Sequence, residues 1–74
     1  MLEIKILLEK LSENGDKIYN FYVIPEHVVY FGYILESLEG WAYYTTIDAV
    51  ESIMHVEVMK DYIIDFDRLL TKII

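Results

Sequence analysis

Apolar and polar residues alternate on both sides of a turn signal, Asn14-Gly15, near the start of the chain. Asn-Gly suits the two central positions of a type I′ turn, because both residues tolerate a positive φ. The sequence therefore predicts a hairpin with a two-residue loop between strands at residues 2–11 and 17–24. In that register Leu8 would face Phe21.

A helix is the alternative for residues 2–11. Its apolar positions also recur at helical spacing, at Ile4, Leu7, Leu8 and Leu11. The alternation and the turn agree with each other, so the hairpin is favoured.

The segment that begins at Pro25 has the period of an amphipathic helix. Proline suits the first helical turn, where its missing N–H would have no partner. One apolar stripe follows, at Val28, Phe31, Leu35 and Leu38. Gly40 suits a left-handed cap after the last turn. Gly32, in the middle, predicts close packing of this helix against a sheet.

Two more strands and a second helix complete the pattern. Residues 41–47 and 53–59 are rich in aromatic and β-branched residues, and residues 48–52 join them in a short loop. One face of the later strand carries Met54, Val56 and Val58. Residues 61–74 form a helix whose apolar stripe is Ile63, Phe66, Leu70 and Ile73.

The order ββαββα predicts one α+β domain over residues 1–74, with two helices on one face of a four-stranded, antiparallel-rich sheet. In the ferredoxin-like fold, a last strand pairs antiparallel with the first. This chain ends on a helix, so its N-terminal strand would take that edge position beside residues 17–24. The result is a permuted ferredoxin-like domain.

Nine aromatic residues and no Lys or Arg fall within residues 19–44. A domain of this size buries only ~60% of its unfolded surface. The chain has no cysteine, so oligomerisation is the remaining way to add stability. We therefore expect a homodimer formed through the sheet face or an edge strand. The interface residues predicted are Tyr22, Trp41, Tyr43 and His55.

The charge excludes several partners. Thirteen acidic residues against six basic ones give a net charge of −7. Nucleic acids and anionic membrane surfaces are bound through clustered Lys and Arg, which are absent here. There is no apolar run long enough to span a bilayer and no signal-peptide pattern. These observations predict a cytoplasmic protein without a nucleic-acid or membrane partner.

No catalytic pattern is evident. His55 and Glu57 share one face of a strand and could begin a metal site or an acid–base pair, but a third convergent group is needed. Asp61, Asp65 and Asp67 do not have the spacing of an EF-hand loop. We therefore predict no enzyme activity, no cofactor, and no catalytic or metal-binding residue.

Short motifs over residues 24–57 resemble a small bacterial family known only as a domain of unknown function. The matching stretches are Ile34-Leu35-Glu36, Leu38-Glu39-Gly40, Thr46-Ile47-Asp48 and Val56-Glu57. The family has a glycine where Ser37 stands here, and it carries more basic residues. The resemblance implies a ferredoxin-like or ACT-like fold and no known catalytic residue.

Two other functions remain open beside self-association. An ACT-like sensor would bind a small molecule at the subunit boundary, with a site made of Tyr33, Glu39, Gly40 and Trp41. An adaptor would bind a larger protein partner.

Overall fold

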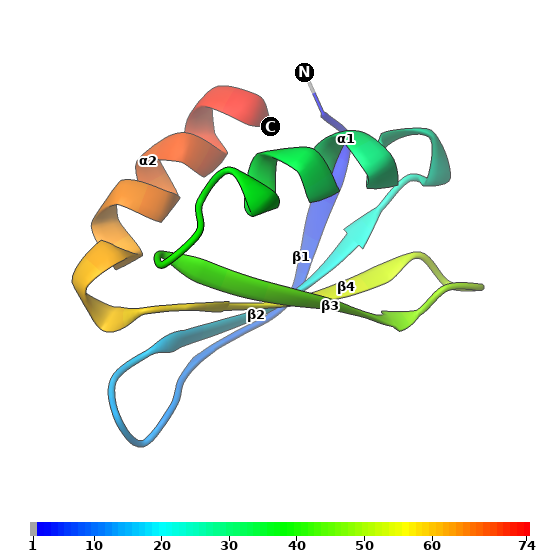
Figure 1. The fold of residues 1–74 in the computed structure, drawn as a ribbon. Coiled ribbons are helices and arrows are strands. Elements are labelled where there is room, and N and C mark those ends of the chain that lie inside the picture. The colour runs from blue at the N-terminus through cyan, green and yellow to red at the C-terminus, as the bar shows by residue number, and fades with distance from the viewer. Residues whose placement is uncertain (1) are drawn as a thin grey trace.

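The computed structural model describes residues 2–74 and contains a four-stranded sheet with two helices over one face (Figure 1). In chain order the elements are β1 (Ile4–Leu11), β2 (Lys17–Val23), α1 (Pro25–Glu36), β3 (Ala42–Asp48), β4 (Ile53–Val58), the 3₁₀ turn η1 (Lys60–Tyr62) and α2 (Ile63–Ile73). The predicted α+β class and element order are confirmed, and the helical alternative for residues 2–11 is wrong.

The strands lie in the order β1-β2-β4-β3, and every neighbouring pair is antiparallel. The N-terminal strand thus occupies the edge beside β2, as predicted from the permuted arrangement. The start of β1 lies beside the end of α2, because the Leu2 N–H donates to the Ile73 carbonyl at 2.6 Å. The Glu3 N–H donates to His27 Nδ1 at 3.0 Å, which ties the same segment to α1.

The β1–β2 loop has three residues, so the predicted two-residue loop is wrong. The Ser12 N–H donates to the Asp16 carbonyl at 2.7 Å and closes the loop around residues 13–15. Gly15 takes φ +93°, as in three-residue hairpin loops that end on a left-handed glycine. The Asn14 side chain stabilises this wider loop by accepting hydrogen bonds from the Ser12 hydroxyl and the Asp16 N–H.

The predicted register of the hairpin changes for the same reason and because β1 has a bulge. Ile6 pairs with Phe21, whereas Leu8 pairs with Asn20 rather than with Phe21. A bulge places two residues of one strand opposite one residue of its partner. Leu7 is the residue skipped in this register. The apolar residues of β1 are therefore divided between both faces of the sheet.

The core lies between the helices and the sheet. The predicted apolar face of β4 and the stripes of both helices are confirmed, and one face of β2 joins them. Their central residues are fully or almost fully buried: Tyr19, Phe21, Val23, Phe31, Leu35, Met54, Val56, Val58, Phe66 and Leu70. Phe21 stacks on Tyr19 with 5.0 Å between ring centroids, and its edge meets Phe31 at 5.4 Å. These ring geometries are favourable for aromatic pairs.

Of the two glycines singled out by the sequence, Gly32 packs toward the sheet as predicted, whereas Gly40 does not cap α1. Gly32 is buried within α1, and an added Cβ would lie 3.6 Å from the Tyr44 hydroxyl, an ordinary van der Waals contact. Gly40 takes φ +87°, but α1 ends at Glu36, so this glycine belongs to the turn that leads into β3.

Candidate interaction surface

The sheet face opposite the helices is not covered by any element of residues 2–74 (Figure 1). We call it the open face. From Ile18 in β2, and along β4, half-buried residues alternate with buried ones, and the half-buried ones point to the open face. The whole open face is defined by three rows of residues that run across the strands from β1 to β3.

Cross-strand register fixes these rows, because directly paired residues share a face. The first row is Lys10, Ile18, Glu57 and Tyr43. The second row is Leu8, Asn20, His55 and Thr45. The third row is Lys5, Tyr22, Ile53 and Asp48. The cations therefore lie on β1, and the carboxylates lie on β4 and β3.

A polar pair stands at the centre of the open face. His55 Nδ1 lies 2.8 Å from Asn20 Oδ1. An amide oxygen only accepts, so the His55 Nδ1 carries the proton in this pair. His55 and Glu57 share a face, as predicted. Within residues 2–74, no group of three His, Cys, Asp or Glu side chains is arranged to hold a metal ion.

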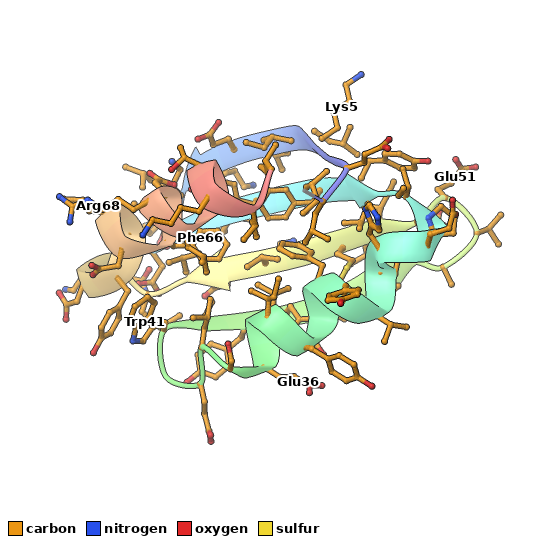
Figure 2. The ribbon with its side chains drawn as sticks, turned by 90° about the horizontal axis from the view of Figure 1, so that it is seen from above. Lys5, Glu36, Trp41, Glu51, Phe66 and Arg68 are labelled. Atoms are coloured by element: carbon orange, nitrogen blue, oxygen red, sulfur yellow. The ribbon has the colours of Figure 1, made fainter. Side chains whose placement is uncertain are left out.

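Three of the four residues predicted for an interface meet on the open face. Tyr22, Tyr43 and His55 lie in its three rows, and Tyr43 is 60% exposed. Trp41 lies at one end of the sheet instead (Figure 2), where its ring stacks on Tyr62 at 5.1 Å and an interplanar angle of 11°. The alternation of strand residues predicted the first three, whereas the Trp41–Tyr62 contact joins segments that are distant in sequence.

The aromatic residues are divided between the core and two surfaces. Tyr19, Phe21 and Phe31 are fully buried. Tyr30 and Tyr33 are each 67% exposed on α1, far from the open face in the layered fold. The core therefore hides part of the aromatic excess, and several rings stay on the surface of the isolated chain.

The four residues predicted for a small-molecule site are not gathered in one hollow. Tyr33 lines a hollow of about 240 Å³ between α1 and β3, together with Tyr44. Glu39 lines a second hollow of about 240 Å³. Gly40 and Trp41 line neither of these two hollows.

Both edges of the sheet are irregular. The pairing of β1 with β2 shifts between Ile6 and Leu8, and the pairing of β3 with β4 shifts between Thr46 and Asp48. Bulges at sheet edges interrupt the regular row of backbone donors and acceptors that another strand would need. The open face is thus a more regular surface than either edge.

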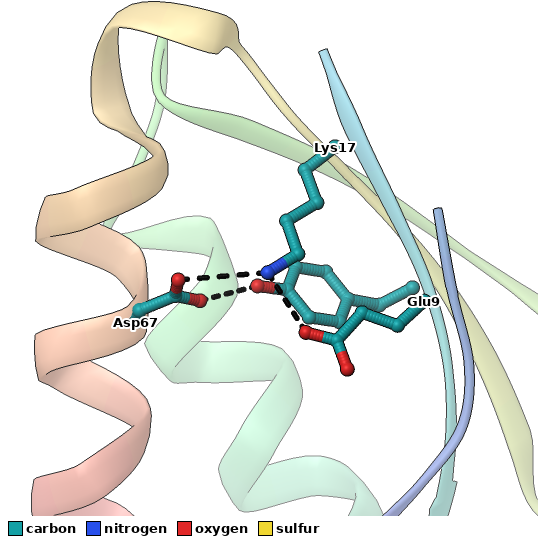
Figure 3. A network of polar contacts seen from close by, with 4 residues as sticks. Glu9, Lys17 and Asp67 are labelled. Atoms are coloured by element: carbon teal, nitrogen blue, oxygen red, sulfur yellow. Dashed lines mark hydrogen bonds and ion pairs between the residues drawn. The ribbon is translucent and has the colours of Figure 1, made fainter. Parts of the chain in front are cut away.

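A polar network on the helix side fixes α2 to the hairpin (Figure 3). Lys17 Nζ lies 2.8 Å from Glu9 Oε1, 3.5 Å from Asp67 Oδ2 and 4.9 Å from the centroid of the Tyr19 ring. The Tyr19 hydroxyl donates to Asp67 Oδ1. Sequence spacing gave no signal for this network, because Asp67 is 48 residues from Tyr19.

The network shifts the ionisation of two of its members. Burial and the hydrogen bond to Asp67 raise the pKa of Tyr19 to about 12. Burial alone would lower the pKa of Lys17, but its contacts with Glu9, Tyr19 and Asp67 raise it above the ordinary value. At neutral pH, Lys17 is therefore charged and Tyr19 is a neutral donor. We call this network, formed by Glu9, Lys17, Tyr19 and Asp67, the clasp.

A family model described as a domain of unknown function, DUF4911, matches residues 21–73. The chain belongs to this family. The match confirms the resemblance seen in residues 24–57 and extends it through the whole of α2, while β1 lies outside the matched residues. No curated protein and no solved structure matches the chain. Neither helix within residues 2–74 has the length and apolar character needed to cross a bilayer.

Proposed function

We propose that this member of the DUF4911 family is a non-catalytic α+β domain that forms a homodimer through its open face. The observation that carries this proposal is an uncovered sheet face that combines apolar side chains with equal numbers of positive and negative ones. Ile18, Tyr22 and Ile53 bring apolar area to its middle, and Tyr43 and Leu8 extend it toward both edges. Covering apolar surface is the main driving force of association.

The size of the open face suits a small but specific interface. Four strands ~4.8 Å apart and about seven residues long give ~400 Å² of flat area per copy. Side chains project from the sheet, so its accessible area is larger than this flat area. The total surface buried between two copies therefore approaches the ~1,200 Å² at which stable interfaces begin. A dimer of micromolar affinity is therefore a reasonable expectation.

The face is a better candidate than either edge for joining two copies. A continuous sheet would require β1 or β3 to pair with its own copy, but β1 has a bulge in its middle and β3 has one near its end. Face-to-face stacking needs no backbone hydrogen bonds and is not hindered by bulges.

The proposed role includes no chemistry. On the open face His55 is engaged by Asn20, and Glu57 is its neighbour along the strand rather than a hydrogen-bond partner. The sensor alternative has weaker support, because its predicted residues line separate hollows or none.

A pair of matched variants tests the surface. Tyr43→Ala removes an exposed ring from the open face, whereas Tyr33→Ala removes the same ring from α1 at a similar exposure, 60% against 67%. We expect Tyr43→Ala to raise the dimer dissociation constant about tenfold in sedimentation equilibrium, about 1.4 kcal/mol. Tyr33→Ala should leave the constant unchanged. Equal effects of both variants would contradict the assignment of the interface.

A further inference from the structure

We infer that the two copies are related by a two-fold axis parallel to the strands, so that β1 of one copy lies over β3 of the other. This inference rests on the proposed homodimer and adds its geometry. Stacked sheets lie ~10 Å apart with strands within ~30° of each other. Two identical faces meeting under two-fold symmetry then have two orientations, with the axis parallel to the strands or across them.

An axis parallel to the strands places each row over the same row of the second copy, in reversed order. In the third row Lys5 lies over Asp48 of the second copy, and Tyr22 lies over Ile53 of the second copy. In the first row Lys10 lies over Tyr43 of the second copy. Each cation therefore meets a carboxylate or an aromatic ring, and Tyr22 meets an apolar residue. Ile18 lies over Glu57 of the second copy.

The first and second rows add further complementary contacts. Lys10 lies one strand away from Glu57 of the second copy, within reach of two long side chains across the stacked sheets. In the second row Asn20 lies over His55 of the second copy, so the central polar pair is repeated across the axis. The polar groups at the middle of the interface then have partners, which buried polar groups require.

An axis across the strands gives the opposite result. It places β1 over β1 and reverses the order of the rows, so Lys10 of each copy lies over Lys5 of the other. Two like-charge contacts then form, and neither lysine lies over a carboxylate. Like charges placed opposite each other across an interface cost several kcal/mol in general. The charge layout therefore selects the axis parallel to the strands.

The overall charge supports a second copy as the partner on this face. The chain has a net charge of −7, which opposes association of two copies. The three rows of the open face contain Lys5 and Lys10 against Asp48 and Glu57, so this face is neutral and the excess negative charge lies elsewhere. A second acidic copy can approach here without net repulsion.

Cysteine cross-linking tests the orientation directly, because the chain has no cysteine of its own. Leu8 and Thr45 stand at opposite ends of the second row, on β1 and β3. Leu8→Cys and Thr45→Cys are made separately, one of them labelled with ¹⁵N, then mixed and treated with a bis-maleimide that spans the ~10 Å between stacked sheets. Thr71→Cys, exposed on α2, is the control.

We expect a mixed Leu8→Cys/Thr45→Cys product, recognised by its intermediate mass, and little product from either variant alone. Self-linking of each variant, with no excess of the mixed product, would overturn the axis parallel to the strands. A dimeric mass without a mixed product would also overturn it, and in both cases the homodimer itself would stand. A monomeric mass for the unmodified chain would instead remove the proposed function, so the two failures are distinguishable.

Discussion

Removing the hydroxyl of Tyr19 should weaken the clasp between α2 and the hairpin without disturbing the core. The Tyr19 ring is fully buried and stacks on Phe21, and Phe keeps both features. Only the hydrogen bond to Asp67 is lost. Hydrogen bonds to charged groups contribute roughly 1.5–3 kcal/mol. The Asp67 side chain is 46% exposed and also contacts Lys17, so we expect Tyr19→Phe to cost about 1 kcal/mol at pH 8.

The same variant should change the response of stability to alkaline pH. Tyr19 has a pKa of about 12 in the folded chain, against the ordinary value of 10.0 in the unfolded chain. Between these values the folded state holds a proton that the unfolded state has lost, so stability falls as pH rises. The contribution of Tyr19 is therefore complete below pH 10 and is lost as pH rises through 12. Tyr19→Phe has no such loss.

Urea unfolding followed by the fluorescence of Trp41, which is the only tryptophan, measures both effects at one fixed protein concentration. The gap in unfolding free energy between the unmodified chain and Tyr19→Phe should be about 1 kcal/mol at pH 8 and smaller at pH 11. Tyr33→Phe removes an exposed hydroxyl and serves as the control. An equal midpoint at pH 8, or a gap that does not shrink at pH 11, would refute this role of the hydroxyl.

Two further predictions concern the core. Gly32→Ala should stabilise the fold by roughly 0.5–1 kcal/mol, because alanine favours the helix and its Cβ fits at 3.6 Å from the Tyr44 hydroxyl; a lower thermal midpoint would show that the space is too tight. Phe66→Ala should cost about 3–5 kcal/mol, since its ring is fully buried against Tyr19 at 5.4 Å. Ile64→Ala, 68% exposed on the same helix, should change stability by less than ~0.5 kcal/mol; equal losses in urea unfolding would contradict the packing of α2.

The spacing of apolar residues predicted most of the fold, because a helix or strand with a single apolar side packs that side into the core. The alternation of β4 correctly separated Met54 and Val56 from His55. The stripe of α2 correctly placed Phe66 and Leu70 in the core. These signals are local, so a sequence is sufficient to detect them.

The hairpin shows where local signals were insufficient. Asn14-Gly15 is compatible with loops of two or three residues, and the choice depends on the hydrogen bonds of Asn14 and on Asp16, whose Oδ1 accepts the distant Lys60 N–H at 2.9 Å. Local sequence patterns also gave no indication of contacts between distant segments. The Trp41–Tyr62 stack joins two segments that are distant in sequence, and the clasp around Lys17 joins three separate elements.

The most direct test of self-association is the molar mass of the unmodified chain at micromolar concentration, measured by light scattering after size exclusion. If a second copy covers the open face, the mass is twice 8.8 kDa and falls toward 8.8 kDa on dilution. A mass of 8.8 kDa throughout the micromolar range would contradict the proposed homodimer.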